Sequence, residues 1–397
     1  MPTSAAVVIV GGGVIGSSIA VRLRQRMKDA RIVVVERDPT YARASSNLAT
    51  GGIRQQYDSP LNVAMARYGT AFYRRFDELT ATCGHRSRAW FRQRGYLFLA
   101  DEGNAEQLEK RYETQKASGA CVERWTQREI AERLDGLATH DVLFGVFGPE
   151  DGYLDPREVL TGLRAMARSA GAEFVHGTVV EVTRGAGRVS AVRMETPEGE
   201  REIATAVVVN AAGAYAAPVG RAAGLTLPID PVRQHLFRLA LEEPLSRRIP
   251  MIFDADGTHW RLDDARSAGD DECLLIGRSR GEEPVGENFD CDHSRLETEM
   301  LPTFARRHPD VRARVVDGWA GLYEMTPDHN ALLGEHPQLP GFIVAAGFSG
   351  HGLMMAPATG LAIAELIADG RSATFDIAPL AVDRFARGTP FANSALV

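Results

Sequence analysis

Cysteine is scarce in this chain of 397 residues, and the scarcity removes several classes of protein. The four cysteines, Cys83, Cys121, Cys273 and Cys291, form no C-x-x-C pair and have no histidine partner at a metal-binding spacing. We therefore expect no zinc or other metal site and no disulfide framework. Isolated cysteines fit a reducing compartment, so we predict that the protein is cytoplasmic.

An excess of positive charge is also lacking. Lysine and arginine total 45 against 52 aspartates and glutamates, which gives a net charge of −7. Because nucleic acids and anionic membranes bind basic patches, we expect neither as a partner. Hydrophobic residues make up 44% and charged residues 24% of the chain, as in ordinary globular proteins. The length suggests two or three domains.

One uncharged segment, residues 2–21, approaches the length of a membrane span, which needs about 20 mostly apolar residues. Three consecutive glycines, Gly11–Gly13, lie at its centre, and no basic stretch precedes it as in a signal peptide. The apolar spacing instead predicts a strand over 7–10, a helix over 14–24 and a strand over 32–35, which form a right-handed βαβ unit. We expect no transmembrane segment.

The rest of the chain also alternates between strand and helix patterns. Strands are predicted within 174–210, where turn residues indicate a β-meander. Residues from about 225 to 322 are predicted to form a second domain, with a polar loop over 263–271. A strand over 342–346 precedes a glycine-rich loop and a helix from about Pro357 to Ala368.

A G-x-G-x-x-G run, formed by Gly11, Gly13 and Gly16, follows the first strand and opens the first helix. Glu36 lies 20 residues after it, at the end of the second strand. In dinucleotide-binding folds the glycines allow a tight turn, close approach of a pyrophosphate and helix packing, and the acidic residue accepts ribose hydroxyls. The N–H groups at the helix start favour phosphate. A glycine turn beside a solvated glutamate is the alternative.

Two further segments favour FAD over a nicotinamide cofactor. Residues 44–54 are small and hydroxylated, which suits contact with a pyrophosphate and a flat ring. Residues 347–352, Gly-Phe-Ser-Gly-His-Gly, form a second glycine-rich loop between a strand and a helix. Two loops so distant in the sequence would both contact a long cofactor, whereas a nicotinamide-dependent dehydrogenase leaves the second loop unexplained.

With these motifs the chain resembles the D-amino acid oxidase (DAO) superfamily of FAD-dependent enzymes, which includes glycine oxidase, sarcosine oxidase and dimethylglycine dehydrogenase. The resemblance covers nearly the whole chain. It is carried by residues 9–16, 45–54, 151–156, 208–215, 323–328 and 347–352. Segment 51–56 and the C-terminal loop are most similar to sarcosine-type enzymes and to a mitochondrial complex I assembly flavoprotein.

The resemblance implies an α/β fold with two domains. The first is a Rossmann-like FAD-binding domain of the glutathione-reductase type, built from residues 1–85, 146–224 and 323–397. The second is an α+β substrate domain on an antiparallel sheet, built from residues 86–145 and 225–322.

The resemblance also implies the contacts to FAD. They are Gly11, Gly13, Val14, Ile15 and Gly16 at the pyrophosphate; Glu36 and Arg37 at the adenosine; Ser45, Ser46, Thr50, Gly51 and Gly52 along the phosphates and flavin; Val180 at the adenine; Ala212 and Gly213 beside the dinucleotide; and Gly350, His351, Gly352, Leu353 and Met354 at the flavin. Gly321 stands where monomeric sarcosine oxidase has the cysteine that bonds to FAD, so we expect non-covalent FAD.

Four residues are candidates for catalysis. In the family an amine gives a hydride equivalent to flavin N5, and water hydrolyses the imine. Arg54 is the first candidate for a cation beside the flavin or the substrate carboxylate, with a surface arginine as the alternative; Arg261 is the second. His351 would contact the flavin. Tyr323 matches a tyrosine of sarcosine oxidase where glycine and D-amino acid oxidases have an arginine, which favours a secondary amine or N-substituted amino acid (EC 1.5 over 1.4).

Other departures leave the electron acceptor open. Met354 replaces a carboxylate-binding lysine of sarcosine oxidase, and Leu275 replaces the lysine that promotes its reaction with oxygen. The acceptor is O2 or another compound. One alternative is a dehydrogenase of the D-amino acid or D-proline type. Another is an FAD-binding assembly or partner-binding flavoprotein, but an organellar factor normally carries an Arg-rich leader, whereas the first strand here begins within about six residues.

Overall fold

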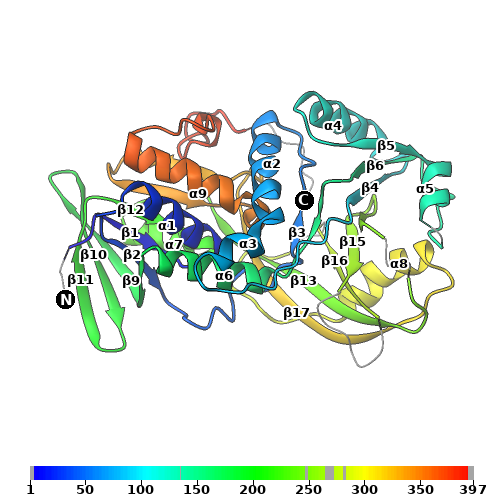
Figure 1. Ribbon diagram of the computed structural model, residues 1–397, viewed down its shortest axis with the longest axis horizontal. Coiled ribbons are helices and arrows are strands. Elements are labelled where there is room, and N and C mark those ends of the chain that lie inside the picture. The colour runs from blue at the N-terminus through cyan, green and yellow to red at the C-terminus, as the bar shows by residue number, and fades with distance from the viewer. Residues whose placement is uncertain (1–3, 135, 246–248, 264–271, 280–282, 392–397) are drawn as a thin grey trace.

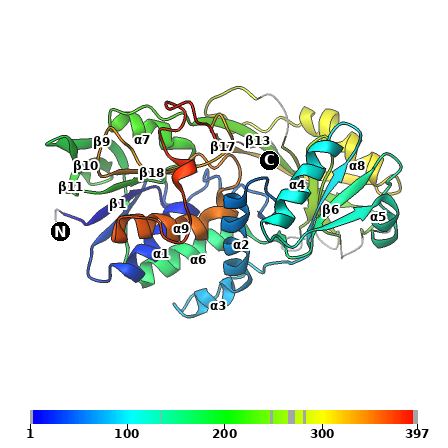
Figure 2. The ribbon, with the colours of Figure 1, turned by 90° about the horizontal axis from the view of Figure 1, so that it is seen from above.

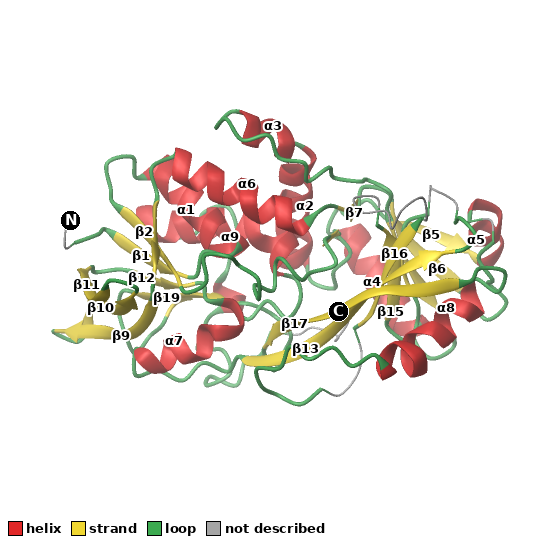
Figure 3. Cartoon of the chain, turned by 90° about the horizontal axis from the view of Figure 1, so that it is seen from below, coloured by secondary structure: helices red, strands yellow, loops and turns green. Residues whose placement is uncertain are grey.

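The computed structural model describes residues 4–134, 136–245, 249–263, 272–279 and 283–391. Two sheets lie side by side along the long axis, and two long strands, β13 (Asp230–Leu241) and β17 (Ala313–Met325), run from one towards the other (Figures 1 and 3). Most of the polar stretch that we expected to be a loop, residues 264–271, lies outside the described residues.

The first sheet has six strands in the order β18-β19-β12-β1-β2-β8, all parallel except β18. Their bounds are β1 Val7–Val10, β2 Ile32–Glu36, β8 Glu173–His176, β12 Val208–Asn210, β18 Leu332–Glu335 and β19 Phe342–Ala346. The apolar run of β1 is buried on both faces: Val7 and Ile9 pack on one side, Val8 and Val10 on the other. Burial on both faces is typical of parallel strands between two layers.

The two covering layers differ. Helices α1 (Val14–Arg26), α6 (Pro156–Ser169) and α9 (Gly352–Asp369) cover one face, with α2 (Pro60–Arg74) and α3 (Phe76–Ala81) beyond them (Figure 2). The antiparallel meander β9 (Thr178–Gly185), β10 (Arg188–Thr196) and β11 (Gly199–Ala204) covers the other, together with η1 (Gly213–Tyr215) and α7 (Ala216–Ala222). The predicted βαβ unit and β-meander are confirmed.

The second sheet has eight strands in the order β17-β13-β16-β15-β14-β4-β6-β5, antiparallel except for the β14–β4 pair. The remaining bounds are β4 Tyr96–Ala100, β5 Glu123–Thr126, β6 Phe144–Gly148, β14 Met251–Phe253, β15 Thr258–Leu262 and β16 Cys273–Arg278. Helices α4 (Ala105–Ala117), α5 (Gln127–Arg133) and α8 (Leu301–Arg307) and the short π-helix η2 (Leu296–Met300) pack around it. A short pair, β3 (Gly52–Ile53) with β7 (Gly152–Tyr153), and the turn η3 (Ala378–Leu380) complete the structure.

Side chains alternate across the second sheet and so divide its two faces. On β15, Trp260 is buried in a cluster with Phe304 of α8, on the outer face. His259 and Arg261, two residues apart, therefore share the opposite face. There His259 stacks on Phe253, with ring centroids 4.5 Å apart. Because of this alternation, His259 and Arg261 face the side of the molecule that contains the six-stranded sheet.

Helix α9 begins earlier than predicted, at Gly352, so Pro357 lies inside it rather than in its first turn. A proline inside a helix has no N–H for the carbonyl four residues before it. Here that carbonyl, on Leu353, accepts a hydrogen bond of 2.7 Å from the hydroxyl of Tyr73 on α2. Among the described residues α9 is long and apolar enough to cross a membrane, but most of it is buried inside the protein.

Two of the predicted domain boundaries fall inside strands. The boundary at 145/146 lies within β6, and the boundary at 322/323 lies within β17. Both strands belong to the eight-stranded sheet. The division into two domains stays a prediction.

Candidate active site

A cavity of about 690 Å³ runs along the carboxyl edge of the first sheet. It is lined by segments that follow β2, β1, β12 and β19, which lie in this order across the sheet. Three strand spacings separate β2 from β19, about 14 Å at about 4.8 Å each. The cavity is therefore elongated, and it lies where open α/β sheets bind their ligands.

The glycine-rich loop after β1 forms the centre of the cavity. A Cβ added at Gly13 would have its nearest neighbour, Ser46 Oγ, 3.9 Å away, so the loop backbone stays open towards the cavity. A Cβ at Gly16 would overlap the carbonyl of Gly11, which explains the third glycine by packing. Helix α1 begins at this loop, and no side chain of the described residues caps it. Its N–H groups face the cavity, as a pyrophosphate requires.

Glu36, which we predicted at the adenosine, lies at the β2 end of the cavity. Its Oε2 accepts a hydrogen bond of 2.8 Å from the N–H of Gly12 and thereby lies against the glycine loop. Glu36 and Arg37 both line the cavity. Val180 does not line the cavity, although we predicted it at the adenine; residues 177–179 of the same segment do. The Val180 side chain is 39% exposed.

The other predicted cofactor residues divide into two groups. Those that line the cavity are Gly11, Gly13, Val14, Ile15, Glu36, Arg37, Ser45, Ser46, Ala212, Gly213, Gly350, Gly352 and Leu353. Those that do not are Gly16, Thr50, Gly51, Gly52, Val180, His351 and Met354. For Gly52 the reason is packing, because an added Cβ would overlap the hydroxyl of Tyr96 from β4.

The C-terminal glycine loop closes the end of the cavity beyond β19. Gly350 has φ +92°, and a Cβ there would lie 2.5 Å from the ring of Tyr323. Tyr323 itself lines the cavity. Tyr323 therefore lies directly against the loop that leads into α9. Burial raises the pKa of its hydroxyl, so the phenol stays protonated.

Arg54 and His351 lie together behind this end. Arg54 is 4% exposed, so the surface alternative is wrong. Its Nη2 is 3.1 Å from His351 Nε2, and its Cζ is 4.3 Å from the centroid of the Tyr57 ring. Burial, with the charge of Arg54, holds the pKa of His351 well below its usual range. His351 is therefore neutral, and its ring accepts from the guanidinium.

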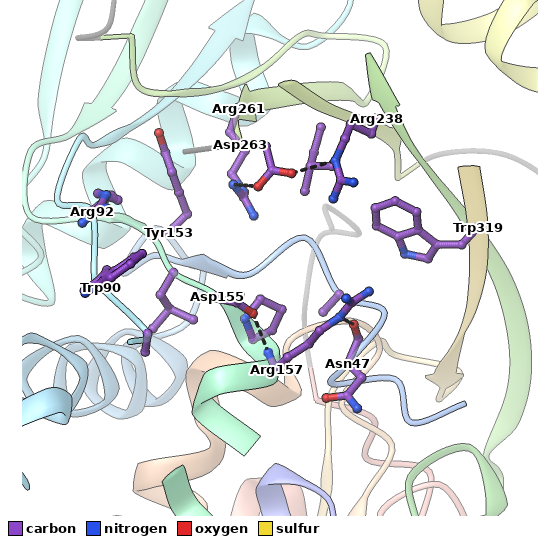
Figure 4. A pocket seen from close by; sticks show the side chains of 15 residues that line it. Asn47, Trp90, Arg92, Tyr153, Asp155, Arg157, Arg238, Arg261, Asp263 and Trp319 are labelled. Carbon is purple, nitrogen blue, oxygen red and sulfur yellow. Dashed lines mark hydrogen bonds and ion pairs between the residues drawn. The ribbon is translucent and has the colours of Figure 1, made fainter. Parts of the chain in front are cut away.

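Arg261 lies elsewhere. Its Nε donates to the carbonyl of Thr50 at 2.8 Å, and its Cζ is 4.6 Å from the ring centroid of Tyr153. It lines a separate groove (Figure 4). The structure thus brings Arg54, His351 and Tyr323 together and places Arg261 on the far side of the segment that carries Thr50.

The sequence analysis missed several residues that line the cavity, among them Tyr215, Glu287 and Glu324. Glu324 lines the cavity, and burial raises its pKa to about 7 even though the N–H groups of Gly347 and Phe348 stabilise the carboxylate. It follows Tyr323 within a motif that we singled out, which was the available signal. His259 lies outside this cavity, against Phe253 of the second sheet; burial lowers its pKa to about 4, so it is neutral.

The chain belongs to the DAO family of FAD-dependent oxidoreductases, whose sequence profile matches residues 6–366. "FAD-dependent oxidoreductase domain-containing protein 1" of Xenopus laevis is 32% identical over 431 residues, which cover 100% of this chain and 85% of that protein. Glycine oxidase of Geobacillus kaustophilus is 29% identical over 393 residues, which cover 95% of this chain and 96% of the oxidase. The structure is similar to the L-proline dehydrogenase of P. horikoshii, with a TM-score of 0.84, 28% identity and coverage of 98% and 100%.

The predicted family, the fold class and FAD as the cofactor are confirmed, and a nicotinamide-dependent dehydrogenase is excluded. The cavity fits FAD because its length, its uncapped helix start and its open glycine loop match a dinucleotide. The resident residues would hold the adenosine at Glu36, the pyrophosphate at Gly13 and Ser46, and the flavin near Tyr323 and Gly350. The protein is an FAD-dependent oxidoreductase.

Proposed function

We propose that this enzyme oxidises the C–N bond of a secondary amine or N-substituted amino acid and that water then hydrolyses the imine. One observation carries the proposal: Arg54 is a buried guanidinium without an ion pair to any carboxylate of the described residues. Its nearest groups are the carbonyl of Gln56 and the neutral His351. A buried unpaired charge is costly, and a ligand carboxylate held by the arginine fork would offset it.

The carboxyl group of Asp151 does not serve as the counter-charge of Arg54. Asp151 is 1% exposed, and desolvation raises the pKa of its carboxyl well above the usual range. Burial therefore favours the neutral form of Asp151, which makes its carboxyl a poor counter-charge for Arg54. The site therefore favours a substrate that brings its own anionic group.

FAD, when bound, supplies the acceptor for the hydride equivalent. The chain's own residues bind and orient the substrate. Arg54 would hold the substrate carboxylate, and the protonated hydroxyl of Tyr323 would contact the substrate at the end of the cavity. The first turn of α9, after His351, directs its positive end to this region and favours negative charge there.

The presence of Tyr323 supports a secondary rather than a primary amine, as the resemblance implies. The names of related proteins point the same way: dimethylglycine dehydrogenase, sarcosine dehydrogenase and L-proline dehydrogenase act on secondary or tertiary amines. Glycine oxidase acts on a primary amine, so the choice needs an experiment. Non-covalent FAD and a cytoplasmic location also stay predictions.

The test is anaerobic bleaching of the flavin absorbance by sarcosine, proline and iminodiacetate against glycine and D-alanine. We expect the secondary amines to bleach faster. Arg54→Gln should slow bleaching at least tenfold with FAD content unchanged, since a charge-assisted contact is lost. The exposed Arg312→Gln serves as the control for net charge. Bleaching by none of the amines, or equal rates in Arg54→Gln, would contradict the proposal.

A further inference from the structure

A segment that follows the eight-stranded sheet reaches the cofactor cavity of the other sheet. Residues 283–290, which we call the strap, come after β16 of the eight-stranded sheet. Glu287, in the middle of the strap, nevertheless lines the cavity at the carboxyl edge of the first sheet. A part of the chain outside the dinucleotide-binding motif therefore contributes to the wall of the cofactor cavity.

The strap is fixed to the start of β13. Arg233 of this strand contacts both ends of the strap: it forms an ion pair of 3.0 Å with Glu283, and its Nη1 donates to the carbonyl of Asp290 at 2.8 Å. The side chain of Glu283 is only 4% exposed. Between these points the N–H of Gly286 donates to the carbonyl of Pro231 at 2.9 Å. The strap therefore has a defined position at the rim of the cavity.

Glu287 contacts three side chains that also line the cavity. Its Oε1 accepts a hydrogen bond of 2.8 Å from the hydroxyl of Tyr215. The same oxygen lies 4.0 Å from Arg37 Nη2 and 3.8 Å from Arg43 Nη1. Burial and this hydrogen bond raise the pKa of Tyr215, so its hydroxyl stays protonated and donates. Partly exposed ion pairs contribute little, so the hydrogen bond, which is assisted by the carboxylate charge, is the stronger contact.

Arg37 and Tyr215 meet across the cavity. Arg37 follows β2 and Tyr215 follows β12, and these strands lie on either side of β1. Two strand spacings, about 10 Å at about 4.8 Å each, separate β2 from β12. The Cζ of Arg37 nevertheless lies 3.3 Å from the centroid of the Tyr215 ring. The pair therefore bridges the part of the cavity that the glycine-rich loop after β1 forms.

We propose that Glu287 holds Arg37 and Tyr215 together across the cavity and thereby slows the release of FAD. A carboxylate repels the phosphates of a dinucleotide, so Glu287 acts through its protein partners and is a positioning residue. Because the strap carries Glu287, a segment attached to the eight-stranded sheet controls how long the cofactor stays bound. The inference requires FAD as the cofactor, and it does not depend on which amine is oxidised.

The test is the rate of FAD release, followed by flavin fluorescence after dilution of the holoprotein. Glu287→Ala and Tyr215→Phe should each speed release about fivefold, as expected for loss of one hydrogen bond at a partly exposed position. The double variant should release FAD no faster than either single variant, because all three lack the same bond. Glu287→Gln, which keeps an acceptor but not the charge, should release FAD at an intermediate rate.

Glu109→Ala is the matched control. The side chain of Glu109 on α4 is 41% exposed, against 46% for Glu287, and it also pairs with an arginine, Arg124. This control should release FAD at the wild-type rate. The association rate of FAD with the cofactor-free protein should not fall in Glu287→Ala, since the proposed contact acts on release.

Two results would overturn the proposal. One is wild-type release rates in both Glu287→Ala and Tyr215→Phe. The other is a double variant in which the two single effects multiply, because Glu287 and Tyr215 would then act on FAD independently. Slower association with unchanged release would also contradict it, since Glu287 would then shape the empty cavity rather than retain the cofactor.

Discussion

Glu324 offers a test of the site's electrostatics that needs neither substrate nor cofactor. Its carboxyl group is buried at the cavity, and one oxygen accepts the N–H of Gly347 at 2.9 Å. Desolvation outweighs this hydrogen bond and raises the pKa to about 7 from 4.5. The folded protein therefore holds a proton on Glu324 at pH values where the unfolded chain has released it.

The sign and size of the effect follow from proton linkage. Because the folded state binds more protons between pH 4.5 and 7, the contribution of Glu324 is full below pH 4.5 and is lost as pH rises through 7. A shift of this size corresponds to about 3 kcal/mol, at about 1.4 kcal/mol per pKa unit. Glu324→Gln removes the titration. The stability of the variant minus that of the wild type should therefore rise by about 2–3 kcal/mol from pH 5 to pH 8.

The assay is urea unfolding of cofactor-stripped protein at pH 5, 6, 7 and 8. Other titrating groups are common to both proteins and cancel in the difference. Glu365→Gln is the matched control, because this buried glutamate has a lowered pKa, held down by Thr374 and Arg26 despite desolvation. Glu365 titrates below pH 4.5, so the stability of Glu365→Gln minus that of the wild type should stay constant from pH 5 to pH 8. A flat difference for Glu324→Gln as well would refute the reasoning.

Three further substitutions test packing at the site and elsewhere in the fold. Gly350→Ala, which places a Cβ 2.5 Å from the Tyr323 ring at φ +92°, should abolish FAD retention; full flavin absorbance after gel filtration would contradict this. Tyr73→Phe removes the donor to the carbonyl left by the helix proline and should cost about 1–2 kcal/mol in urea unfolding, whereas a loss below about 0.5 kcal/mol would show that water replaces it. Asp254→Ala leaves Arg307 without its most buried partner and should cost about 3–5 kcal/mol; a change under about 1 kcal/mol would contradict a buried pair.

The parts of the fold that depend on local spacing could be predicted from the sequence. The strand, glycine loop and helix over residues 7–26 form because apolar period and glycine position act within one βαβ unit. The start of α9 could not be predicted in the same way. The helix extends back to Gly352 because Tyr73, which is 280 residues from Leu353, replaces the missing proline donor.

The candidate site also depends on contacts between residues that are distant in the sequence, so it could be predicted only in part. The resemblance implied that Gly51 and Gly52 lie along the cofactor, but tertiary packing against Leu154 and Tyr96 sets their positions. The contact of Arg54 with His351 joins residues 297 positions apart, and only the resemblance suggested both. The groove could not be predicted at all, because its lining extends from Asn47 to Trp319 and has no shared motif.

The pairing of β13 with β17 limits how the enzyme opens. The two strands pair at twelve positions, from Asp230 opposite Met325 to Leu241 opposite Ala313, with a shift of register between Arg238 and Leu239. Tyr323 and Glu324 lie near one end of this ladder, and its other end belongs to the sheet that carries Arg261. A hinge between the halves would have to bend or break this ladder. We therefore expect substrate entry and product exit to depend on surface loops and side-chain rotation rather than on closure of one half over the other.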